Sequence, residues 1–131
     1  MGLFGKLTGK TNATETQNIQ WQELTTEAEL EALIERSNTI PCVIFKHSTR
    51  CSISSMAKGR FERNWDMEGT EIEPYYLDLI AHRPVSNKIA ETLGVVHQSP
   101  QIILVKNGEA IYDTSHNDIT VEELKNQINN S

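Results

Sequence analysis

One cysteine, Cys51, stands in the stretch FKHSTRCSIS, between a short apolar run and what we expect to be the first turn of a helix. A thiol at a helix start can act as a nucleophile, because the unpaired N–H groups of the opening turn and the helix dipole favour the thiolate. We expect the N–H groups of Ile53 and Ser54 to point toward the sulfur. A helix dipole alone stabilises a thiolate by only about 0.3–1 kcal/mol. This is less than full ionisation of the thiol near pH 7 requires, so the hydroxyl of Ser54 or Thr49 must contribute as well.

The residues around Cys51 are basic, although the chain as a whole carries a net charge of −6. Five Lys or Arg and one Glu lie between Lys46 and Arg63, which gives this span +4. We interpret Lys46, His47 and Arg50 as groups that stabilise the thiolate or steer an anionic thiol toward it. The alternative is an ordinary solvated helix face. The overall acidity argues against a nucleic-acid partner, which would need clustered Lys and Arg.

Length and composition predict one globular domain. The chain has 131 residues, of which 37% are hydrophobic and 23% charged. Residues 1–17 read as a polar extension of low order, and residues 18–131 as the domain. The apolar runs are too short to span a membrane and no secretory signal begins the chain, so we expect a cytoplasmic protein without a membrane partner. Its thiols should be reduced there. Cys42 lies in an apolar strand and should pack in the core rather than bridge to Cys51.

The periodicity of apolar residues and the turn signals predict a β-α-β-α-β-α-β-β-α order. We expect strands at 19–22, 41–45, 74–79, 101–106 and 109–114, and helices at 26–36, 52–65, 84–93 and 120–128. Strands that alternate with helices favour parallel crossovers, and the Asn107-Gly108 turn adds an antiparallel hairpin. The sequence therefore predicts an α/β fold with a mixed central sheet and helices on both faces. On the 52–65 helix the expected core residues are Ile53, Met56, Ala57, Phe61 and Trp65.

Several of these motifs resemble known proteins. The C-x-x-S run Cys51–Ser54, together with Ser99-Pro100 before the fourth strand, resembles the thioredoxin superfamily. Its redox motif opens a helix and faces a cis-proline loop. More narrowly, FKHSTRCSIS, YYLDL, HRPVSNKIA, the VxHxSPQ loop and the VKNGE hairpin resemble the monothiol bacilliredoxin family, from about Ile19 onward. The family signature T-C-P-I-S differs here, because Arg50 and Ser52 replace its Thr and Pro. This difference bears on the reaction rate more than on the fold.

The resemblance implies a thioredoxin-like fold and a redox activity. Cys51 would attack the mixed disulfide between a client protein and bacillithiol, and would carry the bacillithiol away. Ser54 stands at the position of a resolving cysteine, so a second low-molecular-weight thiol must regenerate the enzyme. Arg50, Ser52, Ser99 and Pro100 would contact the substrate, with Ser99-Pro100 as a cis peptide. No bound cofactor and no metal are implied; bacillithiol is a co-substrate, and bacillithiolated proteins are the partners.

A chain with one such cysteine could have three other functions. A thioredoxin-like adaptor would bind a partner protein and leave Cys51 idle. A glutaredoxin-like carrier would hold an iron–sulfur cluster with Cys51 and an external thiol. A Cys–His hydrolase would need one of the four histidines beside the thiolate, and no residue spacing supports that arrangement.

Overall fold

The computed structural model describes residues 19–131, and the predicted polar extension at 1–17 lies outside the described residues. The strands are β2 (Gln22–Glu23), β3 (Cys42–His47), β4 (Glu73–Asp78), β5 (Gln101–Lys106) and β6 (Glu109–Ser115). The helices are α1 (Glu27–Arg36), α2 (Ser52–Asn64), α3 (Arg83–Leu93) and α4 (Val121–Asn129), and a short 3-10 helix, η2 (His116–Asp118), precedes α4. The predicted order of elements is confirmed.

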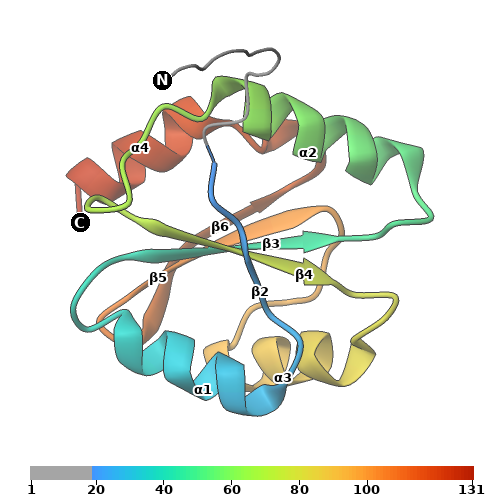
Figure 1. Cartoon of the computed structure of the whole chain (residues 1–131), viewed down its shortest axis with the longest axis horizontal. Coiled ribbons are helices and arrows are strands. Elements are labelled where there is room, and N and C mark those ends of the chain that lie inside the picture. Colours follow the sequence, from blue (N-terminus) through green and yellow to red (C-terminus); the bar gives the residue numbers. More distant parts are fainter. Residues whose placement is uncertain (1–18) are drawn as a thin grey trace, which may run out of the picture.

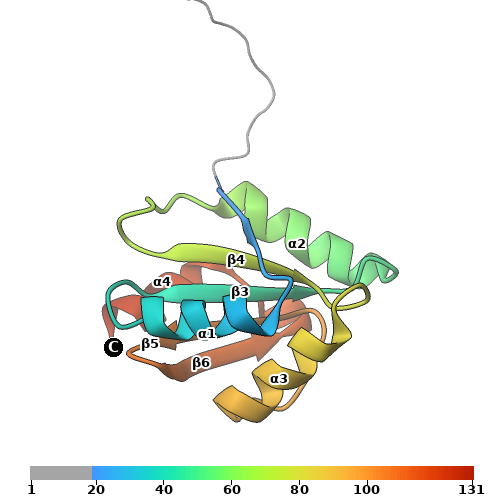
Figure 2. The same cartoon turned by 60° about the horizontal axis from the view of Figure 1, so that its bottom comes forward.

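The five strands form one mixed sheet in the order β2-β4-β3-β5-β6. β3 is central: it runs parallel to β4 and antiparallel to β5. Helices α1 and α3 cover one face of the sheet, and α2 and α4 cover the other (Figure 1). The view turned by 60° brings the α1–α3 side of the sheet forward (Figure 2). The predicted α/β class with helices on both faces is therefore confirmed.

The apolar run of β3 supplies core residues to both layers, because successive side chains of a strand point to opposite faces. Val43 and Phe45 pack with the α2–α4 layer. Cys42 and Ile44 pack with the α1–α3 layer. The same alternation sends His47 to the first face and Lys46 to the second, which decides what each of them contacts.

Local signals place several element ends as predicted. Thr26 and Glu29 form both hydrogen bonds of a capping box at α1. Gly94 ends α3 in the left-handed conformation, with φ 69°. Asn107 and Gly108 have φ 53° and 80°, as a type I′ hairpin between β5 and β6 requires.

Two predictions about the core and the first strand are wrong. The first strand is only Gln22–Glu23, because it pairs with just Tyr75 and Tyr76 at the edge of the sheet. On α2, Ile53 and Met56 are 55% and 68% exposed. The buried stripe of this helix runs through Ser54, Ala57 and Phe61, so Ile53 and Met56 lie on its outward side.

Candidate active site

Cys51 lies where β3 ends and α2 begins, as predicted. It is the N-cap residue of α2, with extended backbone (φ −116°, ψ 121°), and its thiol is free and partly exposed. Its N–H donates to the Ser48 carbonyl at 3.1 Å, and its carbonyl accepts from the Ser55 N–H at 3.1 Å. These bonds fix the cysteine backbone at the carboxyl edge of the sheet, where open α/β sheets bind their ligands.

The sulfur of Cys51 does not cap the helix. Its side chain makes no hydrogen bond with the first turn, so the expected bonds from the N–H groups of Ile53 and Ser54 are not formed. A neutral thiol is a weak acceptor compared with the oxygen of a usual N-cap residue. The donors of the first turn are therefore left for a thiolate or for a substrate.

Ser54 is buried and its hydroxyl faces inward. Its Oγ lies 2.6 Å from Nδ1 of His47 and accepts the Ser48 N–H at 3.1 Å. Burial, and then the charge of Lys58, lower the pKa of His47, so the imidazole is neutral near pH 7 and accepts the Ser54 O–H. This bond ties the end of β3 to the first turn of α2. Sequence reasoning missed the bond, since the partners lie on separate elements.

Two of the basic residues near Cys51 in the sequence, Lys46 and Lys58, contact other groups. Lys46 points to the α1–α3 face, where its Nζ lies 2.7 Å from Nδ1 of His97. Lys58 pairs with Glu62 at 2.6 Å and lies 4.9 Å from the centre of the Tyr76 ring. Arg50, next to Cys51, is exposed.

Among the described residues, the exposed side chains of Thr49, Arg50 and Ser52 make no hydrogen bond or ion pair. These three side chains are therefore available to a substrate. Tuning of the thiolate by Lys46, His47 and Thr49 stays a prediction, and so does substrate contact by Arg50 and Ser52.

The Ser99–Pro100 peptide bond is cis, as the resemblance implies. It directly precedes β5, whose first residue, Gln101, pairs with Lys46 near the end of β3. The loop thus lies at the same edge of the sheet as Cys51. Pro100 is buried, and the Ser99 hydroxyl is buried without a hydrogen-bond partner among the described residues.

Apolar side chains are exposed on α2 and on the loop before Pro100. Ile53 and Met56 are on the first two turns of α2, and Val96, which is 79% exposed, is on the loop before Pro100. Ile53 and Met56 were predicted to lie in the core. Exposed apolar residues near a partly exposed thiol form a surface of the kind that contacts other proteins.

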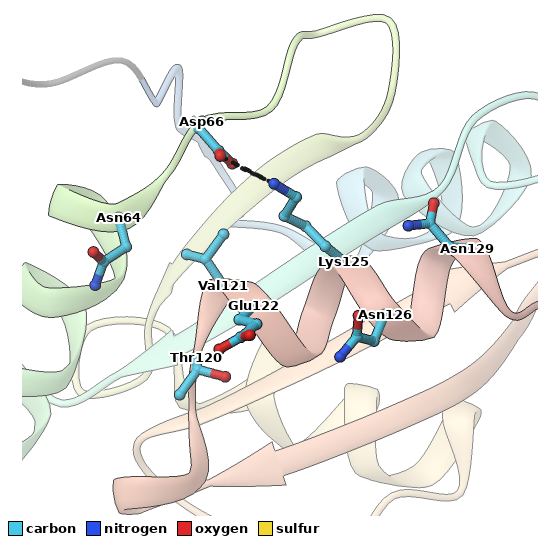
Figure 3. Close-up of a pocket in the computed structure, with 8 residues that line it drawn as sticks. All are labelled: Asn64, Asp66, Thr120, Val121, Glu122, Lys125, Asn126 and Asn129. Carbon is cyan, nitrogen blue, oxygen red and sulfur yellow. Dashed lines mark hydrogen bonds and ion pairs between the residues drawn. The ribbon is translucent and has the colours of Figure 1, made fainter.

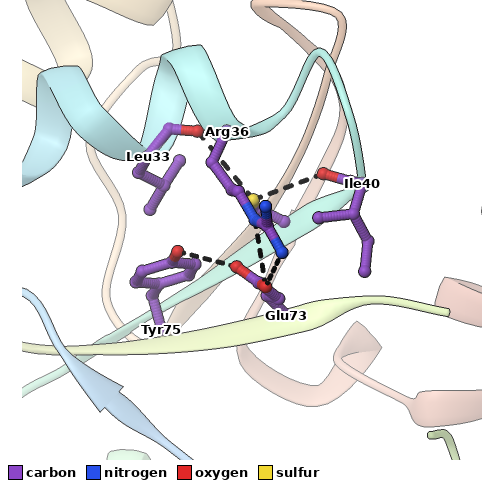
Figure 4. A network of polar contacts seen from close by, with 6 residues as sticks. Leu33, Arg36, Ile40, Glu73 and Tyr75 are labelled. Carbon is purple, nitrogen blue, oxygen red and sulfur yellow. Dashed lines mark hydrogen bonds and ion pairs between the residues drawn. The ribbon is translucent and has the colours of Figure 1, made fainter. Parts of the chain in front are cut away.

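Cys42 is a core residue, as predicted. Its sulfur is buried near the carbonyls of Ile40 and Leu33, at 3.5 and 3.9 Å (Figure 4). Burial raises the pKa of the Cys42 thiol to about 12, so this thiol is neutral at physiological pH. Because β3 rises by about 3.3 Å per residue, Cys42 lies more than roughly 15 Å from the far end of the strand that leads to Cys51. Both cysteines are free.

A surface hollow of about 460 Å³ lies beside α4 (Figure 3). It is formed by α4 and by the segment that follows α2, and Lys125 pairs with Asp66 across it at 3.0 Å. Cys51 is at the opposite end of α2, which is about 20 Å long at 1.5 Å per residue. Within residues 19–131, no three His, Cys, Asp or Glu side chains gather to hold a metal ion.

The fold and the position of Cys51 define a class of protein. A solved protein assigned as an oxidoreductase with a thioredoxin fold is 30% identical to this chain, with a TM-score of 0.69, and the match covers 80% of this chain and 90% of that one. Thioredoxin from Malassezia sympodialis is 19% identical, with a TM-score of 0.67, and the match covers 92% of this chain and 97% of that one. Thioredoxin from Schistosoma mansoni is 19% identical, with a TM-score of 0.64, and the match covers 85% of this chain and 94% of that one. The chain has the thioredoxin fold.

The family follows from a second comparison. Residues 22–124 match the family model described as "Monothiol bacilliredoxin BrxC". The chain belongs to the monothiol bacilliredoxin family, and the fold and family together support a redox thiol protein. In the part of the chain that the structure describes, no helix is long and apolar enough to cross a membrane.

Proposed function

We propose that this protein is a monothiol thiol-disulfide oxidoreductase that removes bacillithiol from mixed disulfides on client proteins. The observation that carries the proposal is one partly exposed thiol at the start of α2, at the same sheet edge as a cis-proline loop. The second cysteine, Cys42, is buried in the core. A dithiol cycle within the described domain therefore has no resolving thiol, and a one-cysteine cycle remains.

The reaction consists of two thiol–disulfide exchanges. The Cys51 thiolate attacks the bacillithiol sulfur of the mixed disulfide; the client–bacillithiol S–S bond breaks, and the client leaves as a thiolate. A new S–S bond now joins Cys51 to bacillithiol. A second low-molecular-weight thiolate attacks this bond, which frees Cys51 and forms a disulfide between the two small thiols. The client sulfur is reduced and the small thiols are oxidised, so no bound cofactor is needed.

The surrounding residues have distinct roles in this proposal. The Ser99–Pro100 segment presents its backbone to the peptide-like part of the substrate. Arg50 and Ser52 contact the bound thiol from the start of α2. Ser54, which is at the position of a resolving cysteine, cannot form a disulfide and instead holds the first turn of α2 through His47. We place this reaction in the reducing cytoplasm.

The test is reduction of a bacillithiolated client protein by the wild type, by Cys51→Ser and by the matched control Cys42→Ser. We expect Cys51→Ser to lose activity and Cys42→Ser to keep it. Intact mass after incubation with oxidised bacillithiol should show one adduct, located on Cys51. Equal rates for the wild type and Cys51→Ser would favour the adaptor function. Visible absorption after anaerobic purification would favour the iron–sulfur carrier.

A further inference from the structure

Three basic side chains come together on the α1–α3 face, at the edge of the sheet that carries Cys51. Lys46 is the last residue of β3 but one and is 0% exposed. Its Nζ lies 2.7 Å from Nδ1 of His97, in the loop before the cis-proline. Arg83 begins α3, and its charge acts on both groups, lowering the pKa of Lys46 and of His97. Residues that are distant in sequence thus form one cluster, positively charged through Lys46 and Arg83, which we call the Lys46 cluster.

The fold holds His97 over Lys46 through Gln101. Gln101 is buried and is the register partner of Lys46 on β5, so the two side chains share a face of the sheet. Its Nε2 donates to the Val96 carbonyl at 3.0 Å, and its Oε1 accepts the Gln98 N–H at 3.4 Å. These bonds fix the loop on both sides of His97. The loop that carries His97 is therefore held by a buried side chain of β5.

No acidic group of the described domain balances the charge of the Lys46 cluster. Among residues 19–131, Lys46, Arg83 and His97 form no ion pair with a carboxylate. Asp78, at the end of the neighbouring strand, accepts the N–H groups of Ile80 and Ala81 at 3.1 and 3.3 Å. A buried cation without a counter-charge is unusual, because such charges are normally paired.

The protonation of the cluster suits an anion. Burial, then Lys46 and Arg83, lower the pKa of His97, so its ring is neutral near pH 7. The Lys46 ammonium donates to Nδ1, which leaves the Nε2–H of His97 as a donor. Ser99, two residues further along the loop, has a buried hydroxyl without a partner among the described residues.

We propose that Lys46, His97 and Arg83 bind a small anionic group, a carboxylate or a phosphate, of the low-molecular-weight thiol that reacts at Cys51. This inference rests on the proposed function and names the chemistry by which the thiol is recognised. The Arg83 guanidinium can bind such a group with two parallel hydrogen bonds, while Lys46 supplies charge from below. An uncharged thiol would lack these contacts.

The first test compares two aromatic disulfides that differ in charge. Reduced protein reacts with 5,5′-dithiobis(2-nitrobenzoate), which carries carboxylates, or with neutral 2,2′-dithiodipyridine; in both, the Cys51 thiolate displaces one aromatic thiolate. We expect Arg83→Gln and Lys46→Met to slow the anionic reagent about 3- to 10-fold relative to the neutral one. Lys88→Gln, on the same helix, should leave the ratio unchanged. An unchanged ratio in Arg83→Gln, which alters an exposed residue, would overturn the proposal.

The second test needs no redox activity. Cys51→Ser protein is titrated with inorganic phosphate and, separately, with malate as a dicarboxylate, while the His97 ring resonances are followed by NMR. Saturable shifts that disappear in Arg83→Gln would support the site, and the tighter probe would show whether phosphate or carboxylate is preferred. Absence of saturation with both probes would overturn it. Because this variant cannot catalyse exchange, a positive result would stand even if client reduction were not observed.

Discussion

Replacement of Lys46 by methionine should stabilise this protein. Lys46 is fully buried, and burial, assisted by Arg83, lowers its pKa from the ordinary 10.5 to about 8. At about 1.36 kcal/mol per pKa unit, keeping Lys46 charged at pH 7 costs roughly 3 kcal/mol of folding free energy. Methionine retains the unbranched shape and loses the bond to His97, which is worth about 1 kcal/mol. We expect a net gain of about 1–2 kcal/mol at pH 7.

The stability advantage of Lys46→Met should depend on pH. Between about pH 8 and pH 10.5 the unfolded chain holds a proton on Lys46 that the folded chain has released. The free energy of unfolding of the wild type therefore rises with pH in this range because of Lys46. The gain is absent from Lys46→Met. Cys42 has the opposite effect above pH 9, since burial raises the pKa of its thiol from 9.0 to about 12, but it acts equally in both proteins. The advantage of the variant should therefore shrink toward pH 10.

The assay is urea denaturation of reduced protein at pH 7 and at pH 9.5, with the free energy of unfolding extrapolated to water. Lys88→Met is the matched control, because Lys88 is a partly exposed lysine of α3 that pairs with Glu91. We expect the control to change stability by less than about 0.5 kcal/mol. A Lys46→Met protein that is less stable than the wild type at pH 7, or a difference that does not change with pH, would refute the reasoning.

Ser54, the two cysteines and Gly94 each allow a further test. Ser54→Ala should destabilise the protein by about 1–3 kcal/mol in urea denaturation, because it leaves Nδ1 of the buried His47 without its donor; a change below 0.5 kcal/mol would contradict this role. A thiol reagent at pH 8 should label Cys51 alone in the native protein and Cys42 as well in urea, as counted by mass spectrometry. Gly94→Ala should lower stability by about 1 kcal/mol, since φ is 69° there; equal denaturation midpoints would argue against strain.

Features set by neighbouring residues were predictable from the sequence. The Thr26–Glu29 capping box, the Gly94 helix end and the Asn107–Gly108 turn each depend on a few adjacent residues and on the backbone angles those residues prefer. The order of strands and helices followed from apolar periodicity. Because Cys51 comes between a strand and a helix, its place at the carboxyl edge of the sheet was also predictable.

The contacts around the site depend on how distant elements pack. Lys46 and His97 are 51 residues apart, and their contact exists only because β5 lies beside β3 with Gln101 opposite Lys46. Ile53 and Met56 fit an apolar helix pattern, but α2 turns a different stripe toward the sheet. The local pattern of α2 allows more than one buried face, and packing against β3 selects one. The amino-acid order thus specifies the elements and the thiol, whereas tertiary packing decides which charges and apolar groups surround that thiol.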